Sequence, residues 1–237
     1  MPRMTVLRRL APNLVTALAL VCGIAAIQAA VSGDPLNGTW WVMWAIVFDK
    51  LDGALARWLN TSSALGAQFD SFADFTSFGL APFFLFEAAS GRGVSPLTVL
   101  FSFVYVLGCV LRLARYNLDG GEKRYFCGVP SPMAAGIPSL ILNISIARGV
   151  DIPGHALLFS ALLALFGVLM NLPWLTYQKI GTENSRVMKV FVLSVVSFCF
   201  VLMLLRRYPE FLLIVSSSMM ISGPILRPFT DRRPELP

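Results

Sequence analysis

Histidine, clustered cysteine and charge are all scarce in this chain of 237 residues. The one histidine is His155, and the four cysteines, Cys22, Cys109, Cys127 and Cys199, lie far apart. This spacing fits neither a zinc site nor a disulfide framework, and a lone histidine leaves little basis for Ser–His or Cys–His catalysis. Charged residues make up 14% of the sequence, whereas a soluble domain has roughly 25%. A soluble enzyme, a secreted disulfide scaffold and a histidine-rich metal site are therefore set aside.

The sequence is rich in long hydrophobic runs, and 56% of its residues are hydrophobic. Several runs approach the length of about 20 residues that a membrane-spanning helix needs. They lie at about 13–31, 38–58, 68–90, 95–117, 131–148, 154–171, 188–205 and 209–225. No linker between them is long enough for a soluble domain. The sequence therefore predicts an all-α fold, a polytopic membrane helical bundle with eight transmembrane helices.

Positive charge is unevenly distributed between the predicted loops. Lys and Arg total 19 against 13 Asp and Glu, a net charge of +6. With the N-terminus inside, only Arg92, Arg148, Arg206 and Arg207 fall on the outer side, and the other basic residues face the cytoplasm. Such a surplus on an apolar chain indicates anionic membrane lipids rather than nucleic acid as a partner. We expect a multi-pass protein of the cell (inner) membrane with both termini in the cytoplasm.

Four carboxylates stand where membrane helices are predicted. Asp49 and Asp52 lie near the end of the second run, and Asp70 and Asp74 near the start of the third. Each would cost about 2.5–3.5 kcal/mol at a helix centre, so a compensating charge is needed. Spacings of three and four residues place each pair on one helix face, and two facing helices would bring both pairs together. Oxygen ligands without His or Cys favour Mg²⁺, Mn²⁺ or Ca²⁺ over zinc.

Small residues and one arginine accompany these acids. Gly53, Ala56 and Gly66 leave room for a ligand or a neighbouring helix, and Arg57 offers a planar donor for phosphate oxygens. Together they predict a site for a pyrophosphate-bearing lipid at the cytoplasmic face. Two alternatives stay open: a salt-bridged seam between two helices, and a divalent-cation transporter, which also places acids in membrane helices. The seam would leave excess negative charge, and a transporter would spread its acids through several spans.

From Asp49 to Asp74 the chain reads D-x₂-D-G-x₂-A-R-x₈-G-x₃-D-x₃-D, which resembles the signature of the CDP-alcohol phosphotransferases. The resemblance implies a six-helix membrane core, usually dimeric, that transfers a phosphatidyl group from a CDP-linked lipid to an alcohol and releases CMP. It also implies two divalent ions, Mg²⁺ or Mn²⁺, bound by Asp49, Asp52, Asp70 and Asp74, with Asp74 as the catalytic base. We therefore expect a homodimer.

The same resemblance assigns further residues to the CDP-lipid. They are Asn13, Thr16, Gly53, Ala56, Arg57, Ser63 and Gly66.

Other segments are similar to the membrane-embedded phosphatidylserine synthases, a branch of this family. They lie at 12–16, 70–82, 112–117 and 126–132. The similarity implies CDP-diacylglycerol as donor and L-serine as acceptor, with residues 1–175 as the core and residues 176–237 as a C-terminal extension carrying two further transmembrane helices. Other acceptors (inositol phosphate, glycerol phosphate or choline) remain alternatives, as does an archaeal ether-lipid donor.

Serine carries a carboxylate and an ammonium, so its pocket should offer a cation near the metals. Arg112 and Arg115 lie one turn apart at the cytoplasmic end of the fourth run and would bind the carboxylate or a substrate phosphate. The alternative is that both reach lipid headgroups. Ser77, one turn beyond Asp74, would add a hydrogen bond.

Overall fold

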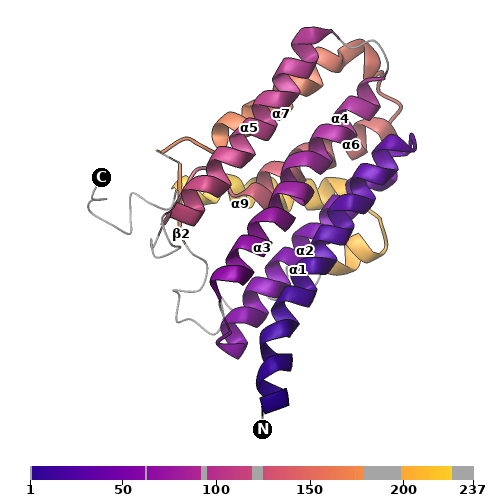
Figure 1. Cartoon of the computed structure of the whole chain (residues 1–237). Helices are drawn as coiled ribbons and strands as arrows, with labels where there is room; N and C mark the ends of the chain where they lie inside the picture. Colours follow the sequence, from indigo (N-terminus) through magenta and orange to yellow (C-terminus); the bar gives the residue numbers. More distant parts are fainter. Residues whose placement is uncertain are drawn as a thin grey trace.

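The computed structural model describes residues 2–61, 63–91, 95–118, 125–173, 175–178 and 199–225, and most of these residues are helical. The bounds of the helices are α1 (Pro2–Val31), α2 (Pro35–Leu59), α3 (Ala64–Asp74), η1 (Phe75–Leu80), α4 (Ala81–Ser90), α5 (Pro96–Leu118), α6 (Ser131–Ala147), η2 (Pro153–His155), α7 (Ala156–Leu169) and α9 (Pro209–Ile225); residues 199–204 are also helical. The described part of the chain also contains two short strands, β1 (Tyr125–Cys127) and β2 (Thr176–Gln178). The long helices lie side by side, and α9 crosses behind them (Figure 1).

The first two helices form an antiparallel pair with a short turn (Figure 1). Gly33 has φ +82 in this turn, a conformation that glycine adopts without strain. The Asp34 side chain then accepts a hydrogen bond from the Asn37 N–H at 3.1 Å and caps α2 at its N-terminus. The acids in the second half of α2 therefore lie toward the end of the bundle where α3 begins.

The third hydrophobic run is one continuous rod made of α3, η1 and α4. Within it η1 is a π-helical turn, since the N–H of Ala81 bonds to Thr76 O, five residues back. Pro82 has no N–H and cannot make the bond to Phe78 O that an α-helix would require. The hydroxyl of Tyr105 in α5 donates to Phe78 O instead.

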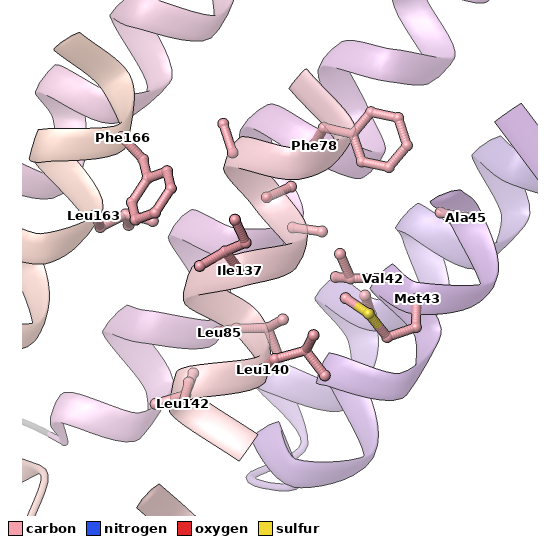
Figure 2. Packing of buried hydrophobic residues seen from close by; sticks show 14 of the residues in the cluster. Val42, Met43, Ala45, Phe78, Leu85, Ile137, Leu140, Leu142, Leu163 and Phe166 are labelled. Atoms are coloured by element: carbon pink, nitrogen blue, oxygen red, sulfur yellow. The ribbon is translucent and has the colours of Figure 1, made fainter. Parts of the chain in front are cut away.

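The core lies between α2, the rod, α6 and α7. Figure 2 shows Val42, Leu85 and Leu140 together in this region, and all three are almost fully buried. α5 and α7 approach each other through glycines, because a Cβ added to Gly108 would lie 2.2 Å from Gly167 O. That distance is too short for any side chain, so the contact requires glycine.

The outer surface of the bundle is also apolar. Leu14, Leu158 and Ile214 are 64%, 66% and 66% exposed, which suits a face turned toward lipid rather than water. Among the described residues, the helices Leu10–Val31 and Pro96–Leu118 have the length and composition to cross a membrane. Shorter apolar helices lie at Ser131–Ala147, Pro153–Leu169 and Pro209–Ile221.

The predicted helical class is confirmed, and the number of eight transmembrane helices stays a prediction. The seventh predicted run lies outside the described residues up to position 198. The strands were not predicted: β1 and β2 pair antiparallel, with Phe126 opposite Tyr177.

Two basic residues predicted on the outer side lie at the end of the bundle that holds the α1–α2 turn. Arg148 pairs with Glu210 at 3.1 Å, and Arg206 donates to Asn37 Oδ1 at 2.7 Å. Arg92 lies outside the described residues. The orientation in the membrane stays a prediction.

Candidate active site

Three of the four predicted acids converge between α2 and the end of α3. Asp49, Asp70 and Asp74 each offer a carboxylate oxygen, and these oxygens all lie within 4.8 Å of one another. Asp70 and Asp74 stand one turn apart on α3, and Asp49 faces them from α2. Three negative charges at this distance repel one another strongly unless a cation lies among them.

Asp52 lies one turn after Asp49 and is 6% exposed. Its side chain interacts with Thr16 of α1, whose hydroxyl also donates to Pro12 O at 3.1 Å. α1 therefore supports the acid-bearing part of α2. Of the four acids, Asp52 is the one whose oxygens fall outside the group of three.

The acids have unsatisfied oxygens. Asp49 Oδ2 and Asp52 Oδ2 are buried and accept no hydrogen bond from the described residues. Lys50 Nζ lies 3.0 Å from Asp49 Oδ2 but without hydrogen-bond alignment, and its side chain is 68% exposed. Buried acceptors without donors are costly. The donor set is all oxygen, so these residues fit Mg²⁺ or Mn²⁺.

The predicted CDP-lipid residues on α1 and α3 lie next to one another. A Cβ added to Gly66 would lie 3.1 Å from Ser63 Oγ and 3.2 Å from Asn13 Oδ1. Ser63 caps α3, because its Oγ accepts a hydrogen bond from the Gly66 N–H at 3.0 Å. Polar groups from two helices thus meet at the N-terminus of α3, an end that favours anions.

The predicted residues on α2 form a stripe with the first acid. Asp49, Gly53 and Arg57 follow at intervals of four residues, so they share one face. A Cβ added to Gly53 would lie 3.4 Å from Arg57 Nη1, which shows that the guanidinium folds back over Gly53. Ala56 is half-buried, and its carbonyl accepts the N–H of Thr61 at 3.1 Å. This stripe presents a cation beside the acids.

Of the three residues predicted to bind serine, one lies beside the acids. Arg112 interacts electrostatically with Asp74 and Asp49, and its Nε is buried without a partner among the described residues. Arg115 is exposed and donates to Asn171 O at 3.4 Å, near the end of α7.

Ser77 is fully buried and points to α1. Its hydroxyl donates to Ala19 O at 3.0 Å. With its proton used in this bond, Ser77 could contribute to serine binding only as an acceptor, and that role stays a prediction.

Two residues near the site were missed in the sequence. Ser131, the first residue of α6, accepts a hydrogen bond from Arg112 Nη1 at 2.5 Å. Tyr105 supports η1 directly after Asp74. Ser131 stands between two prolines before an apolar helix, a pattern that marks a helix start. Tyr105 has no such signal, since an aromatic residue in an apolar run is typical of packing.

Comparisons with known proteins relate this sequence to one family. A sequence model of the CDP-alcohol phosphatidyltransferase family matches residues 9–223. The CDP-diacylglycerol–serine O-phosphatidyltransferase of Helicobacter pylori is 30% identical over 189 residues, which is 78% of each chain. Proteins with the same name from Bacillus subtilis and Methanocaldococcus jannaschii are 29% and 32% identical, over 56% and 66% of this chain and 75% and 68% of their own lengths.

Proposed function

Because this chain belongs to the CDP-alcohol phosphatidyltransferase family, we propose that it transfers the phosphatidyl group of CDP-diacylglycerol to L-serine, giving phosphatidylserine and CMP. The family predicted from the sequence is confirmed by the match to residues 9–223. The serine acceptor is supported by relatives that carry one name across bacterial and archaeal sources.

The observation that carries the proposal is the convergence of Asp49, Asp70 and Asp74 within 4.8 Å. These three acids, with Asp52, would hold two divalent ions, Mg²⁺ or Mn²⁺. When bound, such ions neutralise a pyrophosphate and stabilise the attacking and leaving oxygens of a displacement. A salt-bridged seam does not account for the cluster, since among the described residues these acids form one ion pair, between Asp49 and the exposed Lys50, and Asp52 Oδ2 is buried without a donor.

The reaction is a direct displacement at phosphorus. The serine hydroxyl oxygen forms a bond to the lipid-side phosphorus of CDP-diacylglycerol, and the bond from this phosphorus to CMP breaks. The hydroxyl proton passes to the Asp74 carboxylate, and CMP leaves with the electron pair. General base catalysis of this kind contributes roughly 10²–10⁴-fold to a rate. No covalent intermediate is needed.

The remaining residues bind and orient the substrates. Arg57 and the N-terminus of α3, with Asn13 and Ser63, would hold the donor phosphates. This surface carries little side-chain bulk, so the CDP-lipid can approach the backbone at Gly53, Ala56 and Gly66. Thr16 would act through Asp52, with which it interacts. On the opposite side Arg112 would bind the serine carboxylate, as its place beside Asp74 supports.

Further parts of the prediction concern the membrane. The site would face the cytoplasm, because Lys50, Arg57, Arg112 and Arg115 all lie toward the acid-bearing end and satisfy the positive-inside rule there. Residues 1–175 would form the catalytic core and residues 176–237 an extension. A homodimer in the membrane would complete the assembly.

The test is acceptor competition with membranes that carry this protein. CMP release and the lipid product are measured with CDP-diacylglycerol, Mn²⁺ or Mg²⁺, and in turn L-serine, glycerol phosphate, inositol phosphate and choline. We expect product with L-serine alone. Product with another alcohol would overturn the acceptor and keep the reaction class, whereas no CMP with any alcohol from folded protein would overturn both. An ether-linked donor run in parallel decides between the two lipid backbones.

A further inference from the structure

The π-helical turn η1 begins at the residue after Asp74 and is held from two sides. Toward α1, the Ser77 hydroxyl donates to Ala19 O at 3.0 Å. Ser77 also packs on Gly23, where an added Cβ would lie 2.4 Å from Ser77 Oγ. Toward α5, Tyr105 donates to Phe78 O. Both bonds join η1 to other helices, so its shape depends on its neighbours.

The bond from Tyr105 takes the place of a bond that the helix itself cannot make. Pro82 removes the N–H that would bond to Phe78 O, and a buried carbonyl without a donor is destabilising. Tyr105 is fully buried, so its hydroxyl has no water to bond with and needs the same partner. One hydrogen bond thus gives Phe78 O a donor and the Tyr105 hydroxyl an acceptor, and it stabilises the π-helical turn.

The turn sets the direction in which the acids of α3 point. A π-helical turn holds one more residue than an α-helical turn, and one residue is about 100° of rotation around the axis of an α-helix. If η1 closed to α-helical bonding while α4 kept its packing, α3 would rotate by about this angle. Asp70 and Asp74 would then turn away from Asp49.

We propose that Tyr105 is a positioning residue for the metal-binding acids: its hydrogen bond to Phe78 O holds the π-helical turn that directs Asp70 and Asp74 toward Asp49. Tyr105 touches neither substrate nor ion and acts through the backbone of η1. The inference rests on the proposed function, since it takes the acid cluster as the metal site. Mutation of residues that orient metal ligands without binding the metal typically changes metal affinity by about 10–100-fold.

The same helix provides a matched control. Ser102 lies one turn before Tyr105 on α5, is fully buried, and its hydroxyl has no partner among the described residues. Ser102→Ala and Tyr105→Phe thus each remove one buried hydroxyl from α5. Only the second removes a bond to η1.

The experiment measures Mn²⁺ binding to purified, detergent-solubilised full-length protein by electron paramagnetic resonance of free Mn²⁺, with thermal unfolding recorded in parallel. We expect Tyr105→Phe to bind Mn²⁺ at least about tenfold more weakly than wild type, and Ser102→Ala to bind as wild type does. Wild-type affinity in Tyr105→Phe, or an equal loss in both variants, would overturn the proposal. If wild-type protein binds Mn²⁺ but forms no lipid with serine, the proposed function is overturned. The comparison of Mn²⁺ affinities between wild type and the variants still tests the role of Tyr105.

A second variant decides the matter if Tyr105→Phe does not fold. The double variant Tyr105→Phe/Pro82→Ala gives the helix an N–H that can bond to Phe78 O in place of the lost hydroxyl, which keeps the carbonyl satisfied but closes the turn to α-helical bonding. We expect the same loss of Mn²⁺ affinity as in Tyr105→Phe. Wild-type affinity in the folded double variant would overturn the proposal.

Discussion

Arg112 of α5 is tied to Ser131, the first residue of α6, by a hydrogen bond of 2.5 Å from Nη1 to Oγ. The same guanidinium interacts with Asp74, so the start of α6 determines where a cation stands beside the acids. This relationship links a helix without acidic residues to the chemistry of the site.

Ser131→Ala should therefore weaken serine binding. A hydrogen bond to a charged group contributes about 1.5–3 kcal/mol, so we expect KM for serine to rise about tenfold or more and kcat to change less. Steady-state kinetics at fixed CDP-diacylglycerol measures both. Ser139→Ala is the control, because Ser139 is fully buried in the same helix and its hydroxyl has no partner among the described residues. An unchanged KM for Ser131→Ala would show that Arg112 does not depend on this bond.

Asp74→Asn should abolish turnover while the protein still folds. The amide keeps the shape of the side chain but cannot accept the serine proton, so we expect CMP release to fall by about 10²–10⁴-fold. Asp151→Asn serves as control: Asp151 caps the turn before α7, accepting from the Gly154 N–H at 3.1 Å, and an amide oxygen can do the same. Full activity in Asp74→Asn would remove Asp74 from the role of base.

Divalent ions should stabilise the fold as well as support activity. Ions that bind only the folded protein add about 2.7 kcal/mol at a hundred times their dissociation constant. We expect the thermal midpoint of wild type to rise with Mn²⁺ and to fall again with a chelator. In Asp49→Asn the rise should be much smaller, since one of the three converging carboxylates is lost. Equal midpoints for wild type with Mn²⁺ and with chelator would contradict a metal site at these acids.

Two glycines should respond to alanine in different ways. At Gly108 the new Cβ would lie 2.2 Å from the backbone of Gly167, so Gly108→Ala should destabilise the bundle by about 1–3 kcal/mol. At Gly53 it would lie 3.4 Å from the end of the Arg57 side chain, an ordinary contact. Gly53→Ala should therefore keep its thermal midpoint and raise KM for CDP-diacylglycerol. The reverse pattern would contradict both assignments.

The coarse fold and the acid cluster could be predicted because each depends on short-range rules. Apolar runs of helix length and acids spaced by three or four residues predict helices and shared faces without knowledge of the partners. The meeting of Asp49 with Asp70 and Asp74 needed one further assumption, that the two helices face each other, and the structure has them do so.

The rest depends on contacts between distant residues. Pro82 is plain in the sequence and indicates an interruption, but the replacement donor, Tyr105, comes from another helix. The strands are three residues each and pair with each other across a long stretch of sequence. Ser131 could be placed at a helix start, whereas its bond to Arg112 depends on how the bundle brings the end of α5 to the start of α6. Residues that support a site are thus harder to find than those that form it.

The hydrogen bond from Tyr105 to Phe78 O joins residues 27 positions apart, and this separation bears on how the protein is made. While the ribosome has produced only the first three runs, Phe78 O has neither its helical donor nor the tyrosine, and lipid offers no substitute. The π-helical turn can become stable only after α5 has been synthesised and has packed against the rod. The convergence of Asp70 and Asp74 on Asp49 is therefore a late event in biosynthesis, and a nascent chain released before residue 105 would carry Asp70 and Asp74 on a helix that is not yet held in its final rotation.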